Sequence, residues 1–260
     1  MKRALLLGTV TLIMGCGGGR ARGGGTAAPA PVSATSASAA TIDSLWRDSE
    51  QAVRHGKWSD AEKSLDRALL EFSPGDPRVA RAHFYLGEAL FAQNRQLESA
   101  REFRKASDET PNDPIAPEAL LRLGDVYADL WRRPELDPTY GQTALATYQE
   151  LLNRYPGSNA AKRGQLRISE LNERFATKEY KAALFYFRLK AYDSAILYLK
   201  DLVATYPKAT VVPEALVKLV QAYKALGYRE DVQETCGYIR RFHPRAPQAG
   251  EVCPSKPAGA

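Results

Sequence analysis

The chain has 260 residues, of which 44% are hydrophobic and 25% charged, and it contains three cysteines. These values are typical of a globular protein, and three cysteines are too few for a small fold held together by disulfides. The net charge is +6. Basic residues are interleaved with acidic residues along the chain and form no separate basic block, which argues against nucleic acid as a partner.

The N-terminus has the features of a secretory signal peptide. Lys2 and Arg3 precede an uncharged, mostly apolar stretch from Ala4 to Ile13, which is about half as long as a membrane-spanning helix requires. The segment Leu12-Ile13-Met14-Gly15-Cys16 resembles the lipobox of bacterial lipoprotein precursors, which are cleaved before the cysteine and acylated on it. The alternative is an ordinary signal peptide with an incidental cysteine.

We therefore predict a lipoprotein signal peptide at residues 1–15 and a lipidated Cys16 at the start of a flexible tether, residues 16–40. Gly17, in place of the Asp that often retains lipoproteins in the inner membrane, favours the outer membrane. The tether is rich in Gly, Ala, Ser, Thr and Pro and offers almost nothing to bury. Residues 245–260 have a similar composition, and we expect a disordered tail there.

The segment between the tether and the tail is predicted to be helical, because apolar residues recur at helical spacing between prolines and glycines. Five units follow the pattern of a helix-turn-helix repeat, the tetratricopeptide repeat (TPR), whose second helix carries a small residue with a large one four positions later. The predicted fold is an all-α superhelical solenoid of about five TPR-like hairpins. The small positions are Ala61, Ser99, Ala144, Ala195 and Val232.

Two insertions interrupt the repeat. Residues from Trp131 to Pro138 enlarge the turn inside the third unit. After Pro156, residues 160–175 are helical in pattern and should continue into residues 178–189 as one helix of about 30 residues, or about 45 Å.

The lipobox, the tether and the five repeats resemble the BamD (YfiO/ComL) family of lipoprotein subunits of the bacterial β-barrel assembly (BAM) machinery, over roughly residues 41–245. Single repeat motifs are unspecific, so the shared irregularities carry more weight. They are Asp137-Pro138 in the enlarged turn, Tyr155-Pro156-Gly157-Ser158, the aromatic Phe185-Tyr186-Phe187 at the end of the long helix, and Tyr206-Pro207 followed by Glu214-Ala215-Leu216.

The resemblance implies a lipid-anchored protein of the outer membrane that faces the periplasm. Its N-terminal repeats 1–2 (residues 41–113) would receive the C-terminal strand of unfolded β-barrel substrates. Its C-terminal repeats 3–5 (residues 114–244) would dock on the POTRA domains of a BamA-like insertase, in a complex with other BAM lipoproteins. The alternative is a periplasmic TPR protein of the Tol-Pal-associated type, which coordinates cell-wall synthesis or division with the envelope.

Three residues on the enlarged turn are candidates for partner binding. Trp131, Arg132 and Arg133 belong to the half of the chain that holds the family-specific irregularities, and Trp and Arg are common interface anchors. A lone turn tryptophan can equally pack back onto its own repeat.

No catalytic arrangement is apparent in the sequence. His55, His83 and His243 are far apart, and no metal-binding, nucleophile or phosphate-binding motif occurs. We therefore predict a protein that is not an enzyme and that uses no cofactor or metal.

The pairing of the other two cysteines stays open at this point. Cys236 occupies the large position of the last repeat, so its sulfur should point between the helices as a small apolar group. A disulfide to Cys253 would require the tail to fold back, which would also cover the exposed end of the solenoid.

Lipidation can be tested with Cys16→Ala. The variant should stay uncleaved or leave the membrane, because the acyl chains provide the anchor. Envelope fractionation and intact mass measure this. An unchanged mass together with continued fractionation in outer membranes would refute the anchor.

Overall fold

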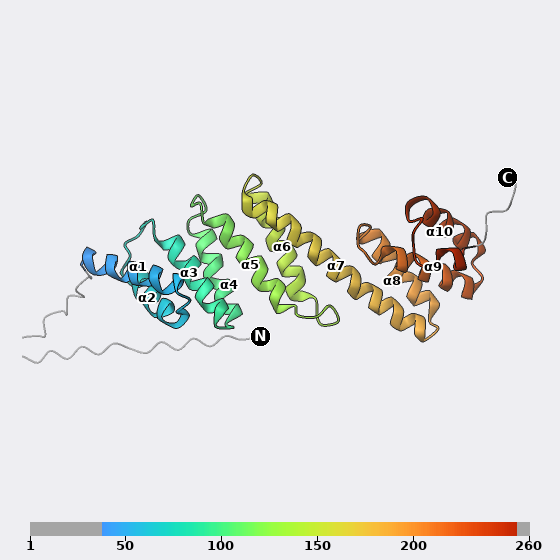
Figure 1. The fold of residues 1–260 in the computed structure, drawn as a ribbon, viewed down its shortest axis with the longest axis horizontal. Helices are drawn as coiled ribbons and strands as arrows, with labels where there is room; N and C mark the ends of the chain where they lie inside the picture. The colour runs from blue at the N-terminus through green and yellow to red at the C-terminus, as the bar shows by residue number, and fades with distance from the viewer. Residues whose placement is uncertain (1–37, 254–260) are drawn as a thin grey trace, which may run out of the picture. The chain divides into compact units, whose positions relative to one another are not determined.

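A computed structural model describes residues 38–253. The predicted signal peptide, Cys16 and nearly all of the predicted tether lie outside the described residues. Within them the chain is helical throughout, and the helices follow one another in a row (Figure 1). They are α1 (Ala39–Arg54), α2 (Trp58–Glu71), α3 (Val79–Ala92), α4 (Gln96–Asp108), α5 (Ala116–Leu130), α6 (Thr139–Arg154), α7 (Asn159–Arg188), α8 (Tyr192–Thr205), α9 (Val212–Leu226), α10 (Arg229–Phe242) and α11 (Ala249–Val252).

Each helix from α1 to α10 packs against the next one along the chain, so the ten form five consecutive hairpins. This confirms the predicted all-α solenoid of TPR-like hairpins. The first helix begins at Ala39, with the Ser38 hydroxyl accepting a hydrogen bond from the Thr41 N–H. The last two residues of the expected tether therefore belong to α1.

The hairpins close through the small and large positions that the repeat pattern predicts. The five small residues are all buried, and the large residues four positions later are fully buried. In two hairpins a glycine of the first helix faces that large residue: a Cβ on Gly124 would lie 2.3 Å from the Tyr148 ring, and one on Gly87 would lie 2.8 Å from Phe103. The large residues are Leu65, Phe103, Tyr148, Leu199 and Cys236.

The buried side chains form three core clusters in chain order, within residues 52–90, 100–175 and 176–253. The predicted division between the two halves at residues 113 and 114 falls inside the second cluster. Phe103 of α4 belongs to that cluster together with Leu120 and Leu123 of α5. Packing is therefore continuous across the expected boundary, as in other solenoids whose repeats contact only their neighbours.

The 30-residue helix α7 confirms the single long helix predicted from residues 160–189. It begins where the Ser158 side chain accepts a hydrogen bond from the Ala161 N–H at 3.0 Å, which is a standard N-cap. Its first half, up to Phe175, belongs to the second core cluster, and its second half, from Ala176, belongs to the third. One unbroken helix thus joins the two clusters.

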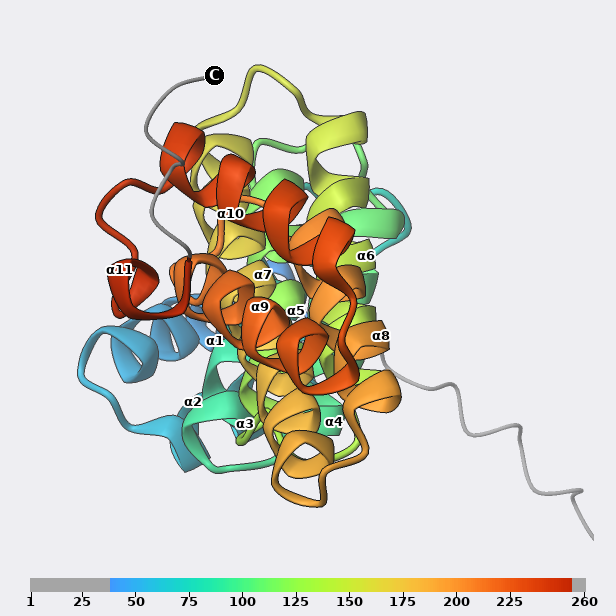
Figure 2. The same ribbon diagram turned by 90° about the vertical axis from the view of Figure 1, so that its right-hand side faces the viewer.

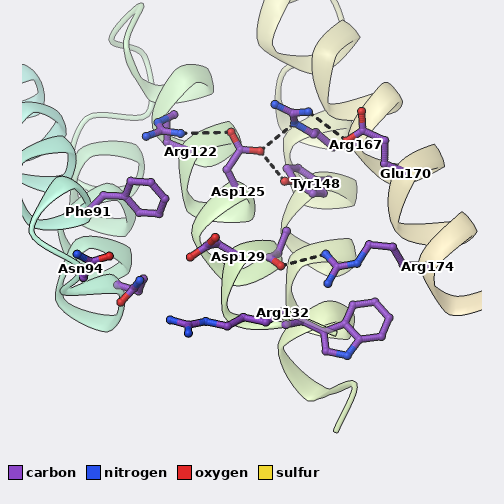
Figure 3. A pocket seen from close by; sticks show the side chains of 13 residues that line it. Phe91, Asn94, Arg122, Asp125, Asp129, Arg132, Tyr148, Arg167, Glu170 and Arg174 are labelled. Carbon is purple, nitrogen blue, oxygen red and sulfur yellow. Dashed lines mark hydrogen bonds and ion pairs between the residues drawn. The ribbon is translucent and has the colours of Figure 1, made fainter. Parts of the chain in front are cut away.

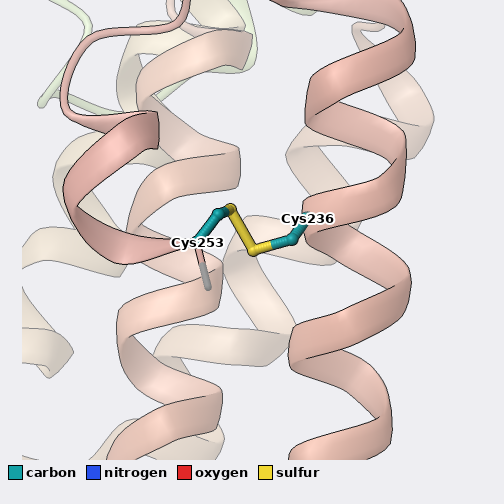
Figure 4. Close-up of a disulfide and its surroundings, with 2 residues drawn as sticks. All are labelled: Cys236 and Cys253. Carbon is teal, nitrogen blue, oxygen red and sulfur yellow. A yellow bond between two sulfur atoms is a disulfide. The ribbon is translucent and has the colours of Figure 1, made fainter. Parts of the chain in front are cut away.

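The C-terminal segment corrects the expectation of disorder from residue 245 onward. Residues up to Cys253 fold back and form the short helix α11, which lies against α9 (Figure 2). Val252 of α11 is buried in the third core cluster, and Cys253 forms a disulfide with Cys236 of α10 (Figure 4). Cys236 is also fully buried, so it fills its repeat position and pairs at the same time.

The glycine contact can be tested with Gly124→Ala. The new methyl group would overlap the Tyr148 ring, which is fully buried and whose hydroxyl is held by a hydrogen bond to Asp125. We expect the free energy of unfolding to fall by about 1–3 kcal/mol in spite of the better helix propensity of Ala. Denaturant unfolding measures the change.

Gly237→Ala is the matched control. Gly237 is also inside a helix, but a Cβ there would meet nothing within 4 Å. We expect it to stabilise the protein by up to about 1 kcal/mol. Equal effects of the two substitutions would show that the contact with Tyr148 is unimportant.

The disulfide can be tested with Cys253→Ser in a Cys16→Ala background, which leaves Cys236 as the remaining cysteine. A cross-link over 17 residues should contribute about 3 kcal/mol to the free energy of unfolding, by restricting the unfolded chain. The Cys16→Ala protein itself, denatured without reductant, should show no free thiol. Two free thiols in that protein would contradict the structure.

Candidate binding groove

The enlarged turn between α5 and α6 holds the three residues predicted to bind a partner. Arg132 and Arg133 are exposed, as expected. Trp131 is not, because only 1% of it is exposed. The expectation of an exposed Trp131 is therefore wrong. The other possibility, that it packs back onto its own repeat, is correct only in part, because Trp131 contacts Gly141 of its own repeat but also Phe175 of the next one.

Trp131 is buried because the turn folds onto α7. Its ring stacks on Phe175 with 4.5 Å between ring centroids, and the Arg174 guanidinium lies 4.5 Å from its ring centroid. A Cβ on Gly141 of α6 would come within 2.3 Å of the indole, so only glycine leaves room for it. An ion pair between Glu135 of the turn and Lys181 of α7 adds a second connection.

The indole N–H of Trp131 has no hydrogen-bond acceptor, although it is buried. Leaving a buried donor unpaired costs about 1–3 kcal/mol. Burial of the large ring and its contact with Phe175 offset this cost.

A groove with a volume of about 680 Å³ opens beside this turn (Figure 3). Helices α3, α5, α6 and α7, the start of α4 and the enlarged turn supply its walls. The lining is mostly polar and holds four arginines and three acidic residues. The lining residues are Phe91, Asn94, Gln96, Arg122, Asp125, Ala128, Asp129, Trp131, Arg132, Tyr148, Arg167, Glu170 and Arg174.

Asp125 of α5 organises one side of the groove. It accepts a hydrogen bond from the Tyr148 hydroxyl at 2.7 Å and another from Arg167 Nε at 3.1 Å. Arg167 also reaches Glu170 at 3.1 Å, and Arg122 lies 3.5 Å from the second oxygen of Asp125. Helices α5, α6 and α7 are thereby connected through one carboxylate.

Burial and neighbouring charges shift the pKa values of three groove residues. Burial raises the pKa of Tyr148, and the charge of Asp125 raises it further. Burial by itself would lower the pKa of Arg122, but its hydrogen bonds to Glu88 at 2.5 and 3.0 Å outweigh this, and the pKa is raised. Burial lowers the pKa of Arg174, against the opposing charge of Asp129.

The groove lining consists mainly of charged and amide side chains. Its lining contains no Cys, Ser or His that could act as a nucleophile, and its tyrosine is held by Asp125. Within residues 38–253 no three His, Cys, Asp or Glu side chains are grouped to hold a metal ion. Fixed arginines, amides and carboxylates suit the recognition of a polar or charged chain.

A second exposed surface lies at the end of the α7–α8 hairpin, and we call it the α7–α8 apolar surface. Phe185 of α7 and Leu189, the residue that caps the C-terminus of α7, are 50% and 62% exposed. Next to them Tyr186 stacks on Tyr198 of α8 at 5.2 Å between ring centroids. The sequence marks this site by its run of aromatic residues. The groove has no comparable signal, because its residues come from five helices and two turns.

No helix in the part of the chain that the structure describes is both long and apolar enough to span a bilayer. Cys16, the predicted site of lipid attachment, lies outside that part.

Comparisons with known proteins give a consistent family. The family described as YfiO, outer membrane lipoprotein, matches residues 38–237. A Caulobacter vibrioides protein named outer membrane protein assembly factor BamD is 23% identical over 192 residues, which cover 74% of this chain and 63% of that protein. A Vibrio cholerae protein of the same name is 33% identical over 103 residues, which cover 40% of this chain and 43% of that protein.

This chain thus spans less than two thirds of the length of both relatives. Among solved structures, a thermophilic TPR protein in Thermus thermophilus is 18% identical, with a TM-score of 0.37, over 81% of this chain and 95% of that one.

Proposed function

Because this chain belongs to the YfiO family of outer membrane lipoproteins, we propose that it is a scaffold for the assembly of outer-membrane β-barrel proteins. It is anchored in the outer membrane through Cys16 and faces the periplasm. The N-terminal repeats receive the C-terminal strand of unfolded barrel substrates. The C-terminal repeats dock on the POTRA domains of a BamA-like insertase, within a complex that includes other BAM lipoproteins.

The family match is the observation that carries this proposal. It extends from residue 38 to residue 237 and so includes both the groove and the α7–α8 apolar surface. The two relatives described above are named as outer membrane protein assembly factors.

The α7–α8 apolar surface supports the placement of the insertase on the C-terminal repeats. Neighbouring apolar side chains that are exposed at the end of a hairpin are typical of a protein-binding site. Phe185 and Leu189 lie on the same side at the C-terminal end of α7 because they are four residues apart. Their place in the fourth hairpin puts them within residues 114–244.

The proposal can be tested with the full-length tagged protein purified from detergent-solubilised envelopes. The unaltered protein should carry the POTRA-containing insertase with it. A variant with Phe185→Glu and Leu189→Glu together should recover at least about tenfold less insertase, because charges replace buried apolar contacts in the complex. Quantitative mass spectrometry measures the recovery.

Leu70→Glu is the matched control, because Leu70 of α2 is 84% exposed and lies in the N-terminal repeats. It should leave the recovery unchanged. If Tol-Pal components or cell-wall enzymes co-purify in place of the insertase, the alternative function replaces this one. If the double variant recovers as much insertase as the control, the docking surface is wrongly placed.

A further inference from the structure

The last long helix of the row, α10, carries a pair of exposed aromatic side chains. One side of this helix is buried in the core through Val232, Cys236 and Ile239. On another side Tyr238 and Phe242, one turn apart, are 40% and 55% exposed, and their ring centroids are 4.8 Å apart. Within residues 38–253 they are the only aromatic residues in ring contact that are both exposed by more than a third.

Basic residues lie next to this aromatic pair. Arg241 and Arg245 are exposed, and the Arg241 guanidinium lies 5.1 Å from the centroid of the Phe242 ring. Residues 235–250 include three arginines and no Asp or Glu, because all three acidic residues of α10 precede position 235. We call this surface the α10 patch, and it consists of Tyr238, Arg241, Phe242 and Arg245.

The α10 patch is fixed by the packing beneath it. The disulfide between Cys236 and Cys253 joins α10 to the segment that follows it. The Ala246 N–H donates a hydrogen bond to the His243 carbonyl oxygen at 2.9 Å, which orders the turn that carries Arg245. Helix α11 packs against α9 and leaves the patch exposed. The patch is therefore a preformed surface.

The helix dipole explains one part of this arrangement. Acidic residues near the start of a helix and basic residues near its end interact favourably with the dipole, and α10 has both. The dipole gives no reason to expose two neighbouring aromatic rings to water. Adjacent exposed apolar side chains are a feature of interaction sites. Together with the arginines, these rings suit a surface that is both apolar and negatively charged.

We propose that the α10 patch binds the surface of a membrane that contains anionic phospholipids. Tyr238 and Phe242 enter the boundary between headgroups and acyl chains, where aromatic side chains are favoured. Arg241 and Arg245 pair with the phosphate groups of the lipids through charge-assisted hydrogen bonds.

The size of the patch favours a membrane over an acidic protein. The patch occupies the outer surface of a single helix end, whereas a stable protein–protein interface buries about 800 Å² on each partner. A membrane contact can be weaker, because the lipid anchor already holds the chain close to the bilayer. To that extent the inference rests on the proposed function. The patch shares no residue with the α7–α8 apolar surface, so lipid and insertase have separate sites.

The test uses the mature chain, residues 16–260 with Cys16→Ala, which keeps every described residue and lacks the acyl chains. Co-sedimentation measures its binding to vesicles of phosphatidylcholine alone and to vesicles of phosphatidylcholine and phosphatidylglycerol in equal parts. We expect about tenfold or more tighter binding to the anionic vesicles. This binding should weaken at high salt, because salt screens the charge of the headgroups.

Arg241→Gln together with Arg245→Gln should lower the affinity for the anionic vesicles about tenfold or more, since each arginine near an anionic surface contributes about fivefold. The variant should unfold at nearly the same temperature as the unaltered chain, because both side chains are exposed. Arg188→Gln together with Lys190→Gln is the matched control. It removes the same charge from exposed positions at the end of α7, and it should bind normally.

The aromatic contribution is tested with Tyr238→Gln, which should also weaken binding to the anionic vesicles. Tyr140→Gln is its control, because Tyr140 is 38% exposed and stacks on one other tyrosine, Tyr127. Equal affinity for the two kinds of vesicle, or equal losses in the patch variants and their controls, would overturn the inference.

Recovery of the insertase from envelopes by the full-length protein separates the possible failures. If the unaltered protein captures the insertase but the mature chain does not prefer anionic vesicles, only the inference is wrong. If the chain ignores these vesicles and Arg241→Gln with Arg245→Gln reduces insertase recovery, the patch binds a protein and not a membrane. If vesicle binding depends on the patch but Tol-Pal components co-purify, the lipid contact stands and the assembly role does not.

Discussion

The structure depends on one unbroken helix that is shared by two cores. Up to Phe175, α7 packs with α5 and α6, and from Ala176 it packs with α8 and belongs to the third core cluster. In a regular solenoid each hairpin contacts only its neighbours, and small rotations between hairpins add up along the row. A continuous hydrogen-bonded helix resists such rotation over its whole length. The groove on its first half and the α7–α8 apolar surface at its end are therefore held at a fixed relation to each other.

The enlarged turn between α5 and α6 packs against this helix. Trp131, Phe175 and Tyr206 form an aromatic series, with ring centroids 4.5 and 6.3 Å apart, that connects the turn, the middle of α7 and the end of α8. This series lies where the second core cluster gives way to the third. Apolar and stacking contacts over the large Trp131 ring offset the cost of its unpaired indole N–H.

Local features of the sequence were sufficient to predict the hairpins. Ala61, Ala144 and Ala195 lie at the small positions of a known repeat, and the structure buries all three. The long helix was also predictable, because the apolar spacing continues through residues 160–189 without a break. The burial of Trp131 and the pairing of Cys253 were not, because each depends on a contact between segments that no local pattern connects. The groove was missed for the same reason, since Asp125, Tyr148 and Arg167 come from three different helices.

The disulfide fastens the segment that covers the C-terminal end of the row of hairpins. In a stacked repeat protein the last hairpin leaves an apolar face that a further hairpin would cover. Here α11 occupies the place on α9, Val252 enters the core, and Cys253 fastens the segment to α10. A partner cannot extend the stack at this end without first displacing a covalently attached segment. Along the sides of the solenoid the groove offers charge, and the α7–α8 apolar surface offers exposed aromatic and aliphatic side chains.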